Sequence, residues 1–143
     1  MDKYEAIKLD NQLCFSFYAI SREIIKLYKP ILDEFNLTYT QYITMLVLWE
    51  EEKISFKKLG IKLHLDSGTI TPVLKKLEAM ELIKKYRTKE DDRAVVVELT
   101  LKGKELKDKI LKVPKEISCK VKLKEEEYKD LKKSLDEVLK KLD

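Results

Sequence analysis

A run of short elements in the middle third of the chain constrains its fold more than any other feature. Ser55 is placed to cap a short helix over residues 56–63, and Asp66 or Ser67 to cap a longer one after a tight turn. The buried side of this longer helix is expected to carry Ile70, Val73, Leu74, Leu77 and Met80. Two strand-like stretches follow, at residues 83–86 and 95–99. Helix, turn, helix and two-stranded hairpin, in this order, make a winged helix-turn-helix.

Narrow apolar seams mark the two ends of the chain. A helix expected over about residues 10–35 has apolar side chains at alternating steps of four and three positions: Leu13, Phe17, Ile20, Ile24, Leu27 and Ile31. A lysine- and glutamate-rich helix at the C-terminus repeats the pattern with Tyr128, Leu131, Leu135, Val138 and Leu142. Such seams favour pairing with a second copy of the chain, and the alternative is that the two end helices pair with each other.

Capping residues and prolines indicate where the other helices begin and break. Thr38 and Gln41 resemble a capping box, and Thr100 begins a later helix. Because proline lacks a backbone N–H, we expect the first helix to bend or break two residues before Pro30, and the last to be interrupted at Pro114. The prediction is a single, mainly α domain over residues 1–143 with a small β-hairpin wing. Its winged helix-turn-helix occupies about residues 38–99, between dimerisation helices at about 10–35 and 100–143.

Positive charge is concentrated in the same middle third. The net charge is +4, but residues 53–93 contain 11 Lys and Arg against 6 Asp and Glu. This distribution favours an anionic partner such as double-stranded DNA, and the alternative is an ordinary solvated surface. The longest stretch without a charged residue has 15 residues, fewer than the roughly 20 of a membrane span. The N-terminus has no signal-peptide pattern, so we expect a cytoplasmic protein without membrane contacts.

The N-terminus of the longer central helix is the part expected to enter the major groove of DNA. Its small hydroxyl side chains and glycine allow a close approach, and free N–H groups at a helix start suit phosphate. Basic residues one turn on would reach the DNA backbone, and those at the hairpin tip an adjacent minor groove. An Arg93–Asp91 ion pair at the tip, and a purely capping role for Asp66 or Ser67, are the alternatives. The expected DNA-reading residues are Asp66, Ser67, Gly68, Thr69, Thr71, Pro72, Lys75, Lys76, Arg87, Lys89 and Arg93.

Several sequence blocks resemble one known family. The stretch DDRAVVVELT, residues 91–100, resembles the wing signature of MarR-type repressors. Blocks over nearly the whole chain resemble the organic-hydroperoxide sensors of that family, the OhrR type: DNQLCFSFY, YKPIL, TYTQY, LWE and LDSGTITP. The resemblance implies a repressor that binds an inverted-repeat operator as a homodimer and responds to organic hydroperoxides.

Cys14 is the residue on which this response would depend. Tyr18 lies about one helical turn beyond it on nearly the same face, whereas Tyr28 lies 14 positions, roughly 21 Å, along the same helix. Tyr28 would therefore reach a cysteine only in an antiparallel partner subunit. The resemblance implies such an arrangement, with tyrosines at the positions of Tyr28 and Tyr39 hydrogen-bonding the sulfur. From the residues alone, the alternative is an inert thiol in an apolar environment.

Cys119, the second cysteine, decides the subtype. Some sensors of this type have one cysteine and use a small external thiol, whereas others have a resolving cysteine after a Val-Pro block, here Val113-Pro114. The resemblance is to the two-cysteine type. We expect peroxide to oxidise Cys14 to a sulfenic acid that Cys119 of the partner subunit captures as a disulfide. An incidental thiol at position 119 is the alternative.

Other classes of function have less support. The single histidine, His64, has no metal-ligand spacing to other side chains, and neither a Gly-rich phosphate loop nor a catalytic triad is visible, so we expect no cofactor, no metal and no enzymatic activity. One rival is a repressor of the same fold that responds to a phenolic or drug-like ligand. The other is a thiol peroxidase that uses Cys14 catalytically.

Overall fold

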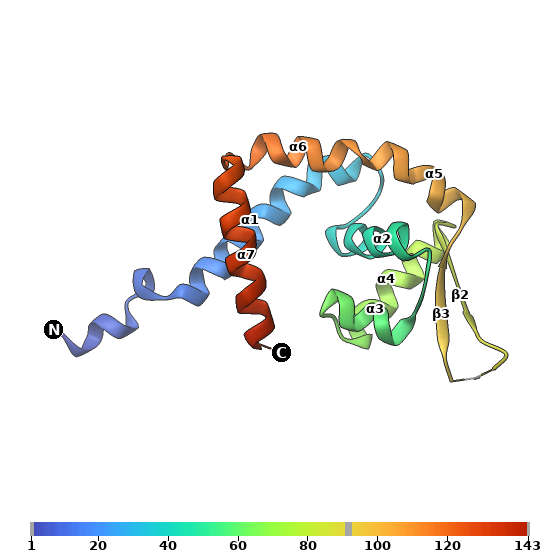
Figure 1. Cartoon of the computed structure of the whole chain (residues 1–143), viewed down its shortest axis with the longest axis horizontal. Coiled ribbons are helices and arrows are strands. Elements are labelled where there is room, and N and C mark those ends of the chain that lie inside the picture. The colour runs from blue at the N-terminus through green and yellow to red at the C-terminus, as the bar shows by residue number, and fades with distance from the viewer. Residues whose placement is uncertain (1, 91–92, 143) are drawn as a thin grey trace.

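The chain forms a compact lobe from which two long helices and an N-terminal arm extend (Figure 1). The computed structural model describes residues 2–90 and 93–142. The arm consists of two 3₁₀ helices, η1 (Lys3–Ile7) and η2 (Leu9–Asn11), and leads into helix α1 (Leu13–Asp33). The prediction that this helix breaks near Pro30 is wrong, because α1 continues through this residue to Asp33. Pro30 and Lys26, whose carbonyl loses its usual donor, are both exposed, so water can replace the missing hydrogen bond.

The helices of the compact lobe begin where the capping residues predict. The capping box of Thr38 and Gln41 opens α2 (Tyr39–Glu51), and Ser55 caps α3 (Phe56–Leu63) by accepting the N–H of Lys58. Asp66, rather than Ser67, caps α4 (Ser67–Ala79). The turn between α3 and α4 is tight because its first residue, His64, adopts a left-handed conformation with φ of 56°.

The wing is a three-stranded antiparallel sheet rather than the expected two-stranded hairpin. Strands β2 (Ile83–Arg87) and β3 (Val95–Leu99) form the hairpin, and β1 (Lys53–Ser55) pairs with the other edge of β3 in the order β1-β3-β2. β1 has only three residues, too few for an alternating pattern to be recognised in the sequence. Its central residue, Ile54, is buried opposite Val97 and so joins the sheet to the core.

The C-terminal part contains α5 (Leu101–Ile110), α6 (Lys112–Lys120) and α7 (Glu125–Leu142). The expected interruption occurs at Leu111, not at Pro114, which lies inside the first turn of α6. The reason is that proline cannot donate to the carbonyl four residues earlier, that of Ile110, so the helical ladder breaks at that point. The Trp49 indole N–H donates to the Gly103 carbonyl at 2.8 Å and fixes α5 against α2.

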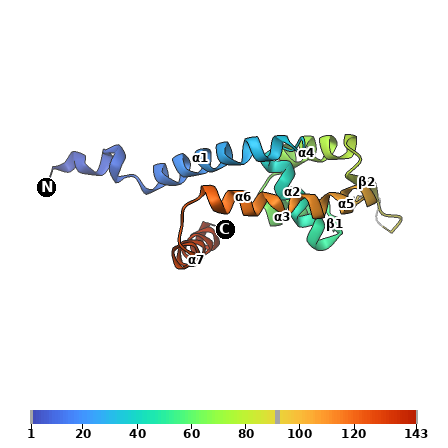
Figure 2. The same ribbon diagram turned by 90° about the horizontal axis from the view of Figure 1, so that it is seen from above.

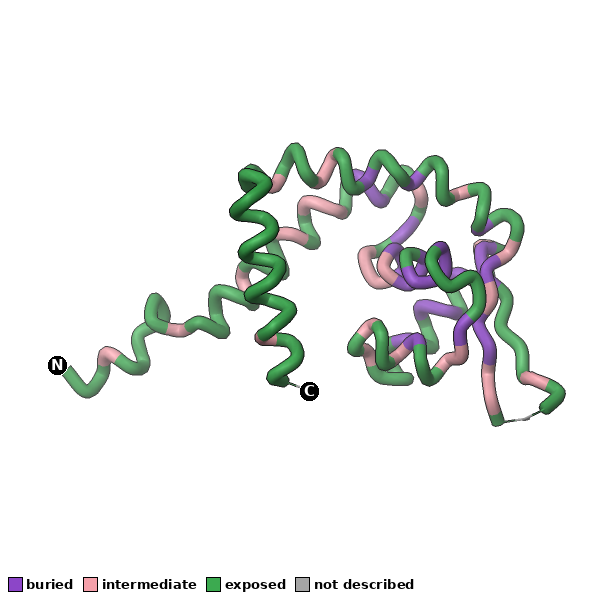
Figure 3. Tube along the Cα trace, in the orientation of Figure 1, coloured by how far each residue is buried: buried purple, intermediate pink, exposed green. Residues whose placement is uncertain are grey.

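Burial is concentrated in the compact lobe, as Figure 3 shows. Side chains of α2, α4, β3 and the start of α6 form one core, and the end of α1 contributes Ile31 and Leu32. The N-terminal half of the α1 seam and most of the α7 seam are exposed: Leu13, Phe17, Ile20, Leu131, Leu135 and Leu142. Seen from above, α1 and α7 do not pack against each other along their lengths (Figure 2). The two end helices therefore do not cover each other's seams within one chain.

No helix in the described part of the chain is long and apolar enough to cross a membrane.

Candidate functional site

Cys14 is the second residue of α1 and is exposed in the single chain. The N-cap residue, Gln12, does not cap the helix with its side chain. Its amide instead donates to the Ala6 and Lys8 carbonyls and holds the arm in place. The N–H groups at the start of α1 are thus left without a side-chain acceptor, and their partial positive charge favours an anion such as a thiolate in the first turn. Asp10, in η2, opposes this effect.

Tyr18 lies one turn beyond Cys14, as predicted, and has a partner that we did not predict. The Arg22 guanidinium donates a hydrogen bond to the Tyr18 phenol oxygen at 3.0 Å, and its Cζ lies 5.5 Å from the centre of the Tyr18 ring. Phe15 flanks the same ring, with 6.4 Å between the ring centres. The sequence does contain a signal for this contact, because Arg22 follows Tyr18 by four residues and Cys14 by eight, which places all three near one face of a helix.

Tyr28 and Tyr39 are brought together at the far end of α1. Their ring centres are 4.9 Å apart, and Tyr42 completes a cluster with centres 5.7 and 6.3 Å from the other two. Burial raises the pKa of Tyr28 to about 12, and the neighbouring phenols add to the effect. Burial also raises the pKa of Tyr39. Both phenols therefore remain protonated hydrogen-bond donors at physiological pH.

One chain does not bring this cluster to its own Cys14. The 14 residues that separate Cys14 from Tyr28 lie on one continuous helix, which corresponds to about 21 Å along the axis. The sulfur and the two phenols of a single chain are therefore too far apart to touch.

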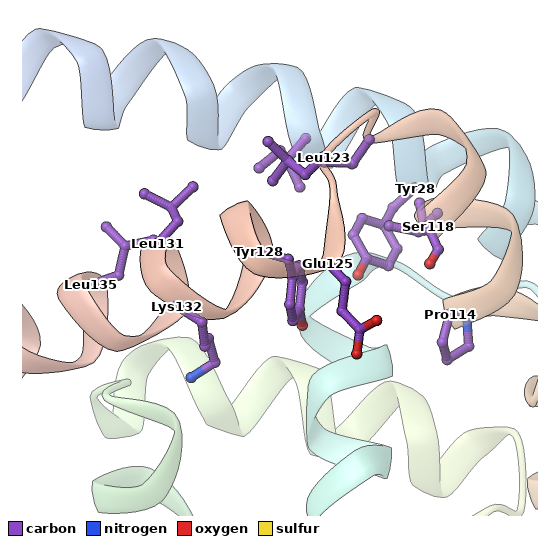
Figure 4. A pocket seen from close by; sticks show the side chains of 12 residues that line it. Tyr28, Pro114, Ser118, Leu123, Glu125, Tyr128, Leu131, Lys132 and Leu135 are labelled. Carbon is purple, nitrogen blue, oxygen red and sulfur yellow. The ribbon is translucent and has the colours of Figure 1, made fainter.

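A cavity of about 600 Å³ lies beside Tyr28, between α1, α6 and α7. Tyr28 enters it from α1 and Tyr128 from α7, with Leu131 and Leu135 farther along α7 (Figure 4). Most of its remaining lining is apolar, and Ile24, Ile117 and Val121 are among these residues. The cavity is an open, apolar recess next to the tyrosine cluster.

Cys119 lies on α6, close to this recess and far from its own chain's Cys14. Ile24 of α1 shares the recess with Ile117 and Val121, which flank Cys119 in sequence. Cys14 precedes Ile24 by ten residues, about 15 Å along α1. A disulfide requires Cα atoms within about 7 Å, so the two cysteines of one chain cannot be joined while α1 stays helical.

The start of α4 presents most of the predicted DNA-reading residues to solvent. Ser67, Gly68, Thr69 and Pro72 are exposed there, as are Lys75 and Lys76 one turn on. Two polar side chains are engaged within the helix itself. The Asp66 carboxylate accepts the Thr69 N–H at 2.8 Å, which holds the pKa of Asp66 below its usual range, and the Thr71 hydroxyl donates to the Ser67 carbonyl at 2.7 Å. Asp66 is therefore the residue that caps α4.

The wing places its basic residues near the end of the β2–β3 hairpin. Arg87 ends β2, and Lys89 and Arg93 lie exposed in the loop. The Arg93–Asp91 ion pair considered above falls outside the described residues, because it involves residue 91. On the sheet itself, Glu98 accepts the Tyr86 hydroxyl at 3.0 Å and pairs with Lys84 at 2.9 Å, a cross-strand set that we did not predict. It is a surface network that stiffens the hairpin.

The described residues include no cluster of three or more histidine, cysteine, aspartate or glutamate side chains able to hold a metal ion. The features that remain are a thiol at one end of α1, phenols at its other end, and exposed basic side chains on α4 and the wing.

Known proteins that are similar to this chain are transcriptional regulators. The model of the SarA/Rot transcriptional regulator family matches residues 26–110. An organic hydroperoxide resistance transcriptional regulator of Bacillus subtilis is 48% identical over 134 residues, which cover 94% of this chain and 91% of that protein.

Solved structures of AbfR from Staphylococcus epidermidis are similar over almost the whole chain. The reduced, DNA-bound form has a TM-score of 0.79 at 37% identity, covering 98% of both chains. The overoxidized, DNA-bound form has a TM-score of 0.79 at 36% identity, covering 99% of both. The disulfide form, at 36% identity, has a lower TM-score of 0.64 and covers 98% of this chain and 93% of the other.

Proposed function

Since this chain belongs to the MarR-type family of winged-helix transcriptional regulators, within which it groups with the organic hydroperoxide resistance regulators, we propose that it is a redox-sensing repressor. A homodimer binds an inverted-repeat operator while Cys14 is reduced. Oxidation of Cys14 by an organic hydroperoxide leads to a disulfide with Cys119 of the partner subunit and releases the DNA. The observation that carries the proposal is the Tyr28–Tyr39 pair, held 4.9 Å apart at the opposite end of α1 from the thiol.

Antiparallel pairing of two α1 helices explains this separation. If Cys14 faces the partner subunit's Tyr28, the two-fold axis passes near position 21, midway between them. The α1 seam from Leu13 to Ile31 is centred on position 22. The exposed N-terminal half of one seam would then fill the apolar recess beside Tyr28 of the other subunit. Each dimer would hold two equivalent sensing sites.

The chemistry needs only the thiol, the phenols and the peroxide. The Cys14 thiolate attacks the outer oxygen of the hydroperoxide, the O–O bond breaks, and the sulfur becomes a sulfenic acid while the alkoxide leaves as an alcohol after gaining a proton. A phenol O–H that donates to the sulfur stabilises the thiolate. Apolar surface around the site would favour peroxides with an organic tail, because burying such a tail adds binding energy that hydrogen peroxide lacks.

The second step joins the subunits. The Cys119 thiolate of the partner subunit attacks the sulfenic sulfur, a disulfide forms, and hydroxide leaves as water after protonation. Within one chain the cysteines are too far apart, so the bridge must be intersubunit or must follow a large rearrangement. Bringing α6 to the start of the partner's α1 would shift α5, which Trp49 fixes to the reading lobe. The spacing of the two α4 helices, which must match successive major grooves, would change.

The structures of AbfR support a role for the disulfide rather than for oxidation alone. AbfR is described bound to DNA both when reduced and when overoxidized, and this chain is equally similar to both forms. The similarity is lower for the disulfide form. We propose that the disulfide step, rather than oxidation alone, releases the DNA.

A non-reducing gel tests the covalent mechanism. After treatment with cumene hydroperoxide, the native protein should run as a covalent dimer, and the Cys119→Ser variant should not. Cys14→Ser should also remain monomeric on the gel, which controls for random air oxidation at position 119. A covalent dimer formed by Cys119→Ser would eliminate Cys119 as the resolving thiol and favour a small external thiol or another route.

A second candidate function is a repressor that responds to a small phenolic or drug-like ligand. The apolar recess of about 600 Å³, with two tyrosines in its lining, favours it. Such a protein would release DNA in response to ligand without thiol chemistry. Ligand-induced release that survives Cys14→Ser would establish this candidate and remove the redox proposal.

A further inference from the structure

We propose that Arg22 is a positioning residue for the sensing thiol. It holds the Tyr18 phenol so that the phenol donates its hydrogen to the Cys14 sulfur, and it supplies positive charge that favours the thiolate. This inference rests on the proposed redox function, but it concerns a residue that this function does not otherwise use.

The three residues lie along one face of α1. Cys14, Tyr18 and Arg22 follow one another at four-residue spacing, so each is about 40° further round the helix than the one before. Long side chains on a helix lean toward its N-terminus, which directs Arg22 over Tyr18 and Tyr18 over the turn that contains Cys14. The first of these contacts is present in the structure, with an Arg22–Tyr18 hydrogen bond of 3.0 Å and the guanidinium over the ring.

The direction of the hydrogen bond leaves the phenol hydrogen available. A guanidinium has only donors, so the phenol oxygen is the acceptor in the Arg22 contact. Within residues 2–90 and 93–142 this is the one hydrogen bond that the Tyr18 side chain makes. Its own O–H is exposed, so water can accept it in the single chain, and a Cys14 thiolate one turn away would compete with that water as the acceptor. Accepting a bond from a cation also polarises the phenol and makes it a stronger donor.

The positive charge of Arg22 would also favour the thiolate form of Cys14. Among the described residues Arg22 makes no ion pair with a carboxylate, whereas Lys26, one turn further on, is paired with Glu23 at 3.2 Å. The charged group that opposes a thiolate at Cys14 is Asp10 in η2. In the proposed dimer, the partner subunit's Tyr28 and Tyr39 add neutral donors. Arg22 is thus the nearby cation whose charge no carboxylate cancels in the described part of the chain.

The pH dependence of thiol reactivity tests this role. In the full-length, reduced Cys119→Ser protein, only Cys14 reacts with iodoacetamide, and the rate rises with the thiolate fraction. We expect Tyr18→Phe to raise the midpoint of this profile by about one pH unit, because a hydrogen bond to a charged group is lost. Arg22→Met should raise it by about half a unit or more, and the shift in the double variant should be smaller than the sum of the two single shifts, because part of the Arg22 effect acts through the same phenol.

Two control variants separate positioning from general effects. Lys26→Met also removes one positive charge from an exposed position of α1, and it should leave the midpoint unchanged. Arg22→Lys keeps the charge but loses the planar group that stacks and donates, so it should restore only part of the shift. Circular dichroism and molar mass should match those of the parent protein for each variant.

Several outcomes would overturn the inference. These are an unchanged midpoint in Arg22→Met, an equal shift in Lys26→Met, or additive shifts in the double variant. None of these measurements involves DNA or peroxide. If the midpoints behave as expected but Cys14→Ser still responds to peroxide, the proposed function fails while the positioning role stands. If Cys14→Ser abolishes the response and Arg22→Met leaves the midpoint unchanged, only the positioning role fails.

Discussion

At the scale of single residues, both positively and negatively charged groups lie near Cys14 along the chain. The first turn of α1 has no side-chain cap, the Arg22 guanidinium contacts the Tyr18 phenol beyond the thiol, and the Asp10 carboxylate precedes the thiol in η2. The Tyr28 phenol, whose pKa is raised by burial, lies at the other end of the helix. In the proposed dimer, the groups that act on the sulfur would therefore come in part from a second copy of the chain.

Asp66 gives a prediction for the pH dependence of stability. Its pKa is lowered in the folded protein because the carboxylate accepts the Thr69 N–H. A lowered folded-state pKa means that the stabilisation is present above the ordinary aspartate pKa and is lost as the pH falls below it. We expect the urea midpoint of the native protein to decline below about pH 4, and Asp66→Asn to lack part of this decline because asparagine caps without titrating.

The matched control for this measurement is Asp108→Asn. This exposed carboxylate has no hydrogen-bond or ion-pair partner among the described residues, so its replacement should leave the acid decline intact. An Asp66→Asn profile that parallels the native one at every pH would show that the cap does not contribute to acid sensitivity.

At the scale of elements, capping residues predict where helices begin better than prolines predict where they end. Thr38, Ser55 and Thr100 cap their helices as expected, because the capping bond is local. The effect of a proline depends on its surroundings, so α1 tolerates Pro30 at an exposed position. The short strand β1 was not predictable, because it exists only through pairing with β3, more than 40 residues later.

The predicted site likewise contains local contacts, which the sequence predicts, and long-range contacts, which it does not. Local relations along one helix, such as that of Tyr18 to Cys14, could be read from spacing. The contact between Tyr28 and Tyr39 could not be derived from spacing alone, because it depends on how α2 packs against α1. The family resemblance supplied that pair of tyrosines, and the structure brings them together. The cross-strand partners of Glu98 were missed for the same reason, since register within the wing sets them.

Gly103 provides a prediction for the junction between α5 and the wing. A Cβ atom at this position would lie 2.3 Å from the Leu82 carbonyl oxygen and 2.6 Å from a Leu99 methyl group. Gly103→Ala should therefore force α5 away from the sheet and lower the free energy of unfolding by roughly 1–3 kcal/mol, measured by urea denaturation. At Gly68 the nearest atom would be 3.4 Å away, so Gly68→Ala is the control and should not destabilise the protein. Equal effects at the two positions would contradict the close-packed junction.

At the scale of the whole molecule, the exposed apolar seams of α1 and α7 favour pairing with a second copy of the chain. Apolar side chains on α1 and α7 face solvent in the single chain, and the recess between α1, α6 and α7 is lined by the same kinds of residue. Contiguous apolar surface of this kind is typical of interfaces between subunits. A dimer through these helices would contain two α4 helices, one for each half-site of an inverted-repeat operator.

A pair of matched variants tests the dimer. Leu135 on α7 and Leu46 on α2 are similarly exposed in the single chain, at 39% and 41%. Leu135→Glu should convert the protein to a monomer, because the charge would be buried in the interface. Leu46→Glu introduces the same charge away from the seams and should leave a dimer. Light scattering after size exclusion gives the molar masses, and a dimeric Leu135→Glu protein would place the interface elsewhere.

The most direct test of the account is operator release by an organic hydroperoxide. A duplex selected by the reduced protein from random DNA serves as the probe, and fluorescence anisotropy follows binding before and after cumene hydroperoxide. The native protein should lose the duplex and recover it with dithiothreitol, whereas Cys14→Ser should stay bound throughout. A Cys14→Ser protein that releases the duplex on oxidation as the native protein does would contradict the central role of this thiol.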